Sequence, residues 1–420
     1  LTDLPNRALF HDHLDQAINA PPDERACIAV LLVGLDSFAS VNGLYGYTAG
    51  DQVLRTLAAR LAETAPAGHV VARFGGDVFA VLAPCSGGDA SDEPLETLAE
   101  RLQAVMQAPV TLDERAVECI ASVGVSGVND GSVAAETMMG QADMALVHAK
   151  RDGNRRIQHF AESMNRTMQQ RLELVGAMRR GLNNGEFALT YQPQCRADGV
   201  WTGLEALVRW QRPGGSAISP GTFIPLAQDN GLIQSLGSEV LRQAVDQASH
   251  WYRAGHPVPV AVNISVGQLH DMSLVTEVRE RLLESGLPPH LLELEVTESG
   301  VMRDLDHGTT VLEQLSALGV RLAIDDFGTG YSSLAYLARL PVDRLKIDKG
   351  FIDAIPTDAR SAALCRAVIE LGRVLGFAIT AEGVETRQQL DWLEAEGCHQ
   401  IQGFYFARPA SPEQLRWPAA

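Results

Sequence analysis

The chain has 420 residues, which is enough for roughly two or three domains with sizeable cores. Hydrophobic residues make up 46% and charged residues 20%, as in an ordinary globular protein, and the net charge of −18 argues against binding to a nucleic-acid polymer or an anionic membrane. No apolar stretch reaches transmembrane length and no signal peptide is visible, so we expect no membrane segment in this sequence.

The six cysteines are scattered along the chain without a C-x-x-C pair. This pattern predicts reduced thiols in a cytoplasmic protein, and neither a disulfide framework nor a zinc site. The sequence begins at Leu1 without a methionine, so an upstream sensor or membrane segment stays an open alternative.

The first 160 residues alternate helical and extended patterns. Strands are predicted over 27–35, 70–74, 78–82 and 118–125, and helices over 6–18, 51–62, 95–107 and 134–150. Gly75, Gly76 and Asp77 separate two of these strands and predict the tight turn of a β-hairpin. We therefore expect residues 1–160 to form an α/β domain with a mostly antiparallel sheet, followed over 161–185 by a connecting helix.

The second half, from residue 172 to residue 420, repeats strand and helix patterns. Strands are predicted at 188–192, 203–209, 258–264, 291–296, 320–324, 344–347, 378–381 and 399–402. The intervening helices include 236–254, 275–284, 308–318, 362–375 and 388–396. About eight strands alternating with helices over roughly 250 residues are typical of a TIM-type (β/α)8 barrel.

Polar residues fall at the ends of these strands, where such a barrel places its chemistry. They are Glu205, Asn263, Glu295, Asp325, Asp326, Lys346 and Glu382. The adjacent carboxylates of Asp325 and Asp326 repel each other unless a divalent cation lies between them. For this pair alone, a solvated acidic turn is an alternative to a metal site. A solvated turn does not explain polar residues at the ends of so many strands. Oxygen ligands without Cys or His favour Mg²⁺ or Mn²⁺ over zinc.

The same positions belong to motifs that occur in order along the second half. The motifs are Glu205-Ala206-Leu207, Val262-Asn263-Ile264-Ser265, Glu295-Val296-Thr297-Glu298, Asp325-Asp326-Phe327-Gly328-Thr329-Gly330, Lys346-Ile347-Asp348, Glu382-Gly383-Val384-Glu385 and Gln402-Gly403-Phe404. With them, residues from about Arg171 to Pro409 resemble the EAL family of cyclic di-GMP phosphodiesterases. A departure is Gln228, where the family usually has Glu.

The resemblance implies a site with two divalent ions that hydrolyses cyclic di-GMP to linear pGpG. One ion is held by Glu205, Asn263, Glu295 and Asp325, and the second by Asp325, Asp326 and Glu382. Lys346 is expected to orient the attacking water and to offset phosphate charge. The ions are expected to be Mg²⁺ or Mn²⁺, and Ca²⁺ should inhibit because it is larger and prefers more ligands at longer distances.

Further roles also follow from the resemblance. Glu298 should position the loop over 325–333, and Asp348 should lie at the substrate and hold Lys346 in place. Gln192 and Arg209 should contact the phosphate or guanine of the ligand, and Gln402 should line the pocket.

The first half resembles a second family. Residues 1–7 (Leu-Thr-Asp-Leu-Pro-Asn-Arg) and the altered hairpin Gly75-Gly76-Asp77-Val78-Phe79 are similar to the GGDEF family of diguanylate cyclases. In that family, facing carboxylates on the first strand and in the hairpin hold metal-bound GTP. Here Gly34 stands in place of the strand carboxylate and Val78 in place of the second hairpin acid. The resemblance therefore predicts an inactive domain with a regulatory or dimerisation role.

Several GTP-binding positions of that family remain. Asn42 and Asp51 match residues that recognise guanine, Asp77 keeps one hairpin acid, and Lys150 matches a residue that meets a phosphate. Asp36 lies two residues from Gly34 on the same face of the strand, where it could partly substitute for the missing acid. GTP binding and a residual diguanylate cyclase activity therefore stay open alternatives.

The whole chain thus resembles the catalytic end of a tandem GGDEF–EAL protein. For the second half, a receptor that binds cyclic di-GMP without hydrolysing it is the alternative. Such receptors usually lack a metal ligand, and none is missing here. The resemblance also implies a homodimer formed through the helices after the Asp-Asp loop.

Overall fold

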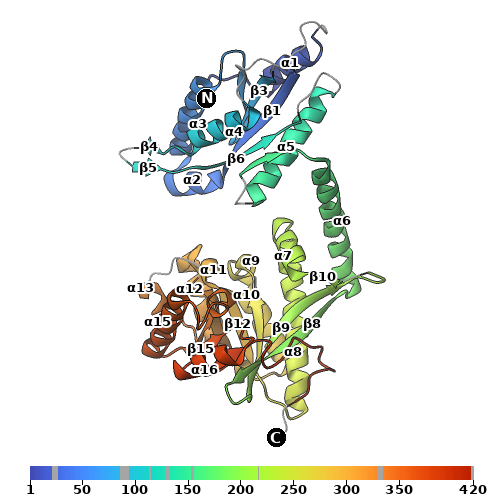
Figure 1. Cartoon of the computed structure of the whole chain (residues 1–420). Coiled ribbons are helices and arrows are strands. Elements are labelled where there is room, and N and C mark those ends of the chain that lie inside the picture. The colour runs from blue at the N-terminus through green and yellow to red at the C-terminus, as the bar shows by residue number, and fades with distance from the viewer. Residues whose placement is uncertain are drawn as a thin grey trace. The chain divides into compact units, whose positions relative to one another are not determined.

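A computed structural model describes residues 1–20, 27–85, 94–112, 115–127, 133–152, 156–215, 217–328 and 334–417. The chain forms two compact units, Leu1–Gln170 and Arg171–Ala420, and helix α6 (Glu162–Asn184) contains the boundary between them (Figure 1). The end of the Asp-Asp motif, from Thr329 to Ser333, and the 153–155 segment lie outside the described residues.

The first unit is built on a five-stranded sheet in the order β2-β3-β1-β6-β7. Its strands are β1 (Cys27–Asp36), β2 (Val70–Gly75), β3 (Val78–Cys85), β6 (Ile120–Val125) and β7 (Ile157–His159). The pairs are antiparallel except β6–β7, which confirms the predicted mostly antiparallel sheet. A separate hairpin joins β4 (Val110–Leu112) to β5 (Arg115–Val117).

Helices cover both faces of this sheet. They are α1 (Arg7–Ile18), α2 (Phe38–Tyr45), α3 (Tyr47–Thr64), α4 (Leu95–Gln107) and α5 (Ala135–Asp152). Alternate residues of β1 enter two different cores, because successive side chains of a strand point to opposite faces. Leu31 and Val33 pack with α3 and α4, whereas Leu32 packs with α1 and α5. Gly34 is two residues beyond Leu32, so it lies on the face that α5 covers.

The second unit is a closed barrel in which neighbouring strands follow the order β9-β11-β12-β13-β14-β15-β16-β8, and β8 pairs with β9. The strands are β8 (Phe187–Arg196), β9 (Trp201–Gln211), β11 (Val260–Ile264), β12 (Leu292–Thr297), β13 (Arg321–Phe327), β14 (Arg344–Ile347), β15 (Ala378–Ala381) and β16 (Gln400–Gln402), with β10 (Ala217–Ile218) beside β9. This arrangement confirms the predicted TIM-type barrel.

The helices of this unit follow the strands along the chain. They are α7 (Pro220–Asp229), α8 (Ile233–Arg253), α9 (Val266–Leu269), α10 (Ser273–Ser285), η1 (Pro289–Leu291), α11 (Glu298–Met302), α12 (Leu305–Ala317), α13 (Leu334–Leu337), α14 (Lys349–Ile352), α15 (Ala359–Leu375) and α16 (Arg387–Ala395). None of the helices in the described part of the chain is long and apolar enough to span a membrane.

Strand β8 departs from an all-parallel barrel, because it is antiparallel to both of its neighbours, β9 and β16. Only the turn over 197–200 separates β8 from β9. Such a short connection can join antiparallel strands, whereas parallel neighbours need a crossover of a dozen or more residues. The first two strands therefore form a hairpin, and the strand–helix alternation begins after β9.

The barrel interior contains two layers of paired charges. Arg344 Nε lies 3.0 Å from Glu293 Oε1, and Arg344 donates a second hydrogen bond to Thr380 Oγ1 at 2.9 Å. Lys346 and Glu295 lie two residues farther along the same strands and form an ion pair of 2.7 Å. Buried charges are costly unless they are paired, and barrel interiors usually hold branched apolar side chains. This polar interior therefore points to a functional site at the carboxyl ends of the strands.

Candidate active site

The centre of the site is the ammonium of Lys346, which is fully buried on β14. Carboxylate oxygens surround its Nζ: Glu382 at 2.5 Å, Glu295 at 2.7 Å, Asp325 at 3.3 Å and Glu205 at 3.8 Å. These four acids come from β9, β12, β13 and the residue after β15, so the closing of the barrel brings them together. One positive charge faces four acidic groups, and the cluster therefore lacks positive charge.

The pKa shifts in this cluster reflect the same imbalance. Burial by itself would lower the pKa of Lys346, but the surrounding carboxylates raise it well above its usual range, so the ammonium stays charged. Burial raises the pKa of Glu295 well above its usual value although Lys346 acts in the opposite direction. Burial likewise raises the pKa of Glu382 to about 8 against the effect of Lys346. The acids thus need protons or further cations to remain buried together.

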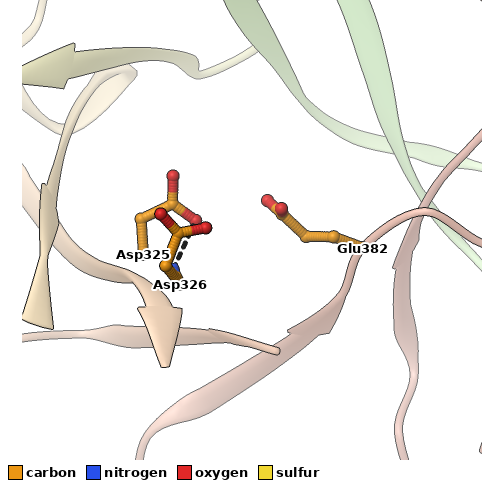
Figure 2. Close-up of side chains that lie close together, drawn as sticks. All are labelled: Asp325, Asp326 and Glu382. Carbon is orange, nitrogen blue, oxygen red and sulfur yellow. Dashed lines mark hydrogen bonds between the residues drawn. The ribbon is translucent and has the colours of Figure 1, made fainter. Parts of the chain in front are cut away.

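Asp325, Asp326 and Glu382 offer a place for such a cation. One carboxylate oxygen from each of the three lies within 4.8 Å of the others, and Figure 2 shows the two aspartates facing Glu382. The buried Glu382 Oε1 lies 2.5 Å from Lys346 Nζ, an ammonium that it shares with Glu295 and Asp325. An all-oxygen donor set whose negative charge exceeds that of the one ammonium fits a hard divalent ion such as Mg²⁺ or Mn²⁺.

An irregular backbone puts both aspartates on one side of β13. Neighbouring side chains of a regular strand point to opposite faces. Here the register shifts between Ile324 and Phe327, so that Asp325 and Asp326 lie opposite the single residue Lys346. Asp326 has a φ of +53°, a left-handed conformation that is uncommon for a residue other than glycine. The bulge and the left-handed residue re-aim a carboxylate, which is a frequent arrangement next to active sites.

Amide side chains from β11 and β16 hold Glu205 in place. Asn263 Nδ2 donates to Glu205 Oε1 at 2.7 Å, and Gln402 Nε2 donates to Glu205 Oε2. Gln402 Nε2 also donates to Gln192 Oε1 at 3.3 Å. The predicted residues Glu205, Asn263, Gln192 and Gln402 therefore lie in one hydrogen-bonded group.

Gln194 is a member of this group that sequence reasoning missed. Its Nε2 lies 3.2 Å from Gln402 Oε1 and 3.5 Å from Glu295 Oε1, and the residue is buried. The available signal was its spacing: Gln192 and Gln194 are two residues apart, so they share one face of β8. The hairpin with β9 turns that face into the barrel.

Two other predicted residues, Glu298 and Arg209, lie around the cluster. Glu298, the first residue of α11, accepts a hydrogen bond from the Gly328 backbone N–H at 2.9 Å, so it contacts the start of the loop assigned to it. Arg209 is half-buried on β9, four residues from Glu205, and donates to the Val208 carbonyl at 3.0 Å. Burial lowers the pKa of Arg209, while Glu205 raises it.

Asp348 does not hold Lys346, contrary to the expectation from sequence. The ion-pair partners of Lys346 in the described residues are the four acids of the cluster. Asp348 instead caps α14, where its Oδ1 accepts a hydrogen bond from the Gly350 N–H at 2.9 Å. The physical reason is its place at the start of a helix, where a carboxylate satisfies an unpaired backbone N–H group.

In the first unit, the predicted nucleotide residues are distributed over several elements. Asn42 lies on α2 and Asp51 on α3, whereas Asp77 lies in the turn between β2 and β3 and Lys150 near the end of α5. The structure brings Lys150 Nζ to 3.5 Å from Asp77 Oδ2.

Asp36 is not free to replace the acid missing at Gly34. Its Oδ2 accepts from Arg156 at 2.9 Å, and Ser122 donates to it at 3.0 Å. The charge of Asp36 is therefore already neutralised by Arg156, and the structure does not support the expectation that Asp36 replaces the missing acid.

Comparisons with known proteins agree with this geometry. Residues 175–409 match the family model described as "EAL domain". The chain belongs to the EAL domain family. Residues 1–156 match the model "Diguanylate cyclase, GGDEF domain", so the EAL domain follows a GGDEF domain.

Curated relatives of this EAL protein include proteins named as cyclic di-GMP phosphodiesterases. It is 43% identical over 99% of its length to the bifunctional diguanylate cyclase/cyclic di-GMP phosphodiesterase MucR of Pseudomonas aeruginosa, and covers 60% of that relative. It is 40% identical over 97% of its length to the cyclic di-GMP phosphodiesterase NbdA of the same organism, and covers 52% of it. The chain therefore spans between about half and three fifths of the length of these relatives.

Solved structures support the barrel assignment. A structure described as "PaMucR Phosphodiesterase, c-di-GMP complex" is 47% identical, with a TM-score of 0.57, and is matched over 58% of this chain and 100% of that chain. The "S helix-GGDEF-EAL" structure of Vibrio cholerae LapD is matched over 96% of this chain and 94% of that one, with a TM-score of 0.63. Its 20% identity supports the fold alone.

Proposed function

We infer that the second half of the chain hydrolyses cyclic di-GMP to linear pGpG. The observation that carries this proposal is the acid-rich cluster around Lys346, in which Asp325, Asp326 and Glu382 converge. Its support is the membership in the EAL family and the relatives named as cyclic di-GMP phosphodiesterases. A receptor that only binds cyclic di-GMP is the competing outcome of the experiment below.

We propose that the cluster binds two divalent ions, Mg²⁺ or Mn²⁺. Glu205, Asn263, Glu295 and Asp325 would hold one, and Asp325, Asp326 and Glu382 the other. When bound, the ions neutralise phosphate charge and increase the acidity of water. Ca²⁺ should inhibit, because its size and longer ligand distances would misplace the reacting groups.

The other side chains of the site bind and orient the substrate. Lys346 keeps its positive charge in the buried cluster, where it offsets phosphate charge and can orient the attacking water through a hydrogen bond. Arg209 lies at the half-buried margin of the site and has no carboxylate ion-pair partner among the described residues, so its guanidinium suits a substrate phosphate. Gln192 and Gln402 present amides that suit the polar edge of a guanine, while Glu298 holds the backbone at Gly328.

For the first half we propose a GGDEF domain without cyclase activity, over residues 1–160, which has a regulatory or dimerisation role. The connecting helix over 161–185 then merges into the EAL domain over 172–420. A cytoplasmic location and a homodimer complete the proposal. Two observations support the lack of cyclase activity. Position 34 is a glycine without a carboxylate, and Asp36 is already bonded to Arg156 and Ser122.

The deciding experiment is incubation of the purified chain with cyclic di-GMP and Mg²⁺, followed by nucleotide chromatography. We expect pGpG from the wild type and none from Glu382→Gln. Glu394→Gln, the same change at an exposed position of α16, serves as the matched control and should retain full turnover. Binding of cyclic di-GMP without any pGpG would establish the receptor instead.

The proposal for the first half has its own measurement. GTP and Mg²⁺ are supplied to a Glu205→Ala chain, in which any cyclic di-GMP would survive. We expect no cyclic di-GMP, because a facing carboxylate is missing. Its appearance would establish a residual diguanylate cyclase.

A further inference from the structure

The space above Gly34 in the first unit is filled by a side chain from α5. A Cβ built at Gly34 would lie 2.8 Å from Lys150 Cε and 2.9 Å from Lys150 Nζ. Real Cβ atoms do not come this close to a neighbour, so any side chain at position 34 would force the end of Lys150 to shift.

The path of Lys150 follows from the packing of α5 on the sheet. A Cβ at Gly124 on β6 would lie 2.1 Å from the backbone N of Leu146, so the helix backbone rests directly on that strand. Lys150 is one turn beyond Leu146, and the close approach brings its side chain over Gly34 on the neighbouring strand β1. Gly34 pairs with Ser122, and Leu32 pairs with Gly124, so the two glycines are diagonal neighbours on this face.

The end of Lys150 lies between groups that would otherwise attract a metal ion. Its Nζ donates to the Leu35 carbonyl at 2.8 Å and lies 3.5 Å from Asp77 Oδ2. Lys150 Nζ also lies 2.9 Å from the Cβ position of residue 34, so an acid at position 34 would lie near Asp77 across the ammonium. A carbonyl oxygen and facing carboxylates form a donor set for a hard divalent cation.

We propose that the ammonium of Lys150 takes the place of the divalent cation in the first unit, so that this GGDEF domain has a metal-free site. The residues present do not fit a divalent ion: one carboxylate remains, its charge is balanced by Lys150, and the ammonium occupies the space. A nucleotide at this site meets an ammonium in place of a metal ion. The proposal also changes the role of Lys150, which the family resemblance predicted to contact a phosphate of the nucleotide.

The proposal is tested by counting the Mn²⁺ ions bound per chain, with Mn²⁺ as the sole ligand in equilibrium dialysis. The sites of the second unit contribute equally to every variant, so only differences matter. Gly34→Asp combined with Lys150→Ala should bind an additional Mn²⁺ relative to the wild type. Gly34→Asn with Lys150→Ala, which has the same size without the charge, should bind none in addition. Adding Asp77→Ala to the aspartate variant should remove the gain.

Single changes complete the test. Gly34→Asp alone should gain no ion, because Lys150 then pairs with both acids, and Asp77→Ala alone should leave the wild-type count unchanged. A loss of Mn²⁺ in Asp77→Ala would show that the native site holds a metal and would overturn the proposal. A gain in Gly34→Asp alone, or no gain in the double variant, would show that Lys150 is not what keeps the ion out. If the double variant does not fold, the Mn²⁺ count of Asp77→Ala still decides whether the native site holds a metal ion.

Discussion

Both units of this chain place a lysine ammonium among oxygen atoms near the ends of strands, but their balance of charge differs. In the barrel, four carboxylates lie within 3.8 Å of Lys346. In the first unit, a single carboxylate, that of Asp77, lies 3.5 Å from Lys150, together with the Leu35 carbonyl. Where several acids surround one lysine, negative charge is left over and favours the binding of divalent cations. Where one lysine pairs with one acid, the charges balance and no cation is needed. The number of facing acids therefore separates the EAL site, for which we propose hydrolysis, from the GGDEF site, for which we propose no cyclase activity.

The largest expected effect comes from reducing the excess of acids in the barrel. Asp325→Asn should lower hydrolysis of cyclic di-GMP by about 10³-fold or more, because this acid is shared by both proposed metal positions and their loss costs several kcal/mol of transition-state stabilisation. Turnover is measured by nucleotide chromatography. Asp391→Asn, an exposed change on α16, is the control and should be silent. A near-normal rate in Asp325→Asn would refute the metal assignment and the contrast between the units.

Removing the lysine from each unit sharpens the comparison directly. Lys346→Met should lower turnover by about 10²–10³-fold, since a preorganised charge aimed at the phosphate is lost. Lys150→Met should leave turnover of cyclic di-GMP close to that of the wild type. Bound Mn²⁺ should persist in Lys346→Met, which separates a loss of chemistry from a loss of metal. Equal effects of the two changes on hydrolysis would remove the distinction between the lysines.

A smaller effect is expected at the margin of the barrel site. Arg209→Ala should raise the KM for cyclic di-GMP by about 10- to 100-fold with a much smaller change in kcat, because a hydrogen bond to a charged group contributes about 1.5–3 kcal/mol. Steady-state kinetics separate the two constants. Arg212→Ala, at an exposed position shortly after β9, is the matched control. A loss confined to kcat would instead place Arg209 among the reacting groups.

The smallest effect is a dependence of metal affinity on pH. Burial raises the pKa of Glu382 to about 8, so the metal-free protein keeps this acid protonated below that pH. A divalent ion requires the carboxylate, and its binding therefore displaces a proton. Affinity for Mn²⁺ should fall as the pH drops below about 8, by at most about tenfold per pH unit for each proton displaced.

Calorimetry in buffers of different ionisation enthalpy measures the proton released on Mn²⁺ binding. Glu382→Gln should weaken binding and flatten its pH dependence. A flat profile in the wild type would mean that Glu382 is already ionised without metal, and the charge imbalance of the barrel would then be smaller than its geometry implies.

The sequence by itself determined the two domains, the barrel class and the identity of the acids at the strand ends. This was possible because strand ends of a barrel meet at one edge, so residues spaced far apart in the sequence, such as Glu205 and Glu382, were expected together. The missing acid at Gly34 was equally visible, because each residue of the hairpin and first strand could be compared with its family position.

Only the tertiary structure decided where individual side chains point. The side-chain alternation of a strand would separate Asp325 from Asp326, and the bulge with its left-handed residue brings them to one side. The short hairpin that makes β8 antiparallel turns Gln194 into the barrel. The close packing of α5 carries Lys150 across Gly34, although these residues are 116 positions apart. Each of these outcomes depends on backbone geometry or on packing between distant segments, and neither is encoded in the local pattern of residue types.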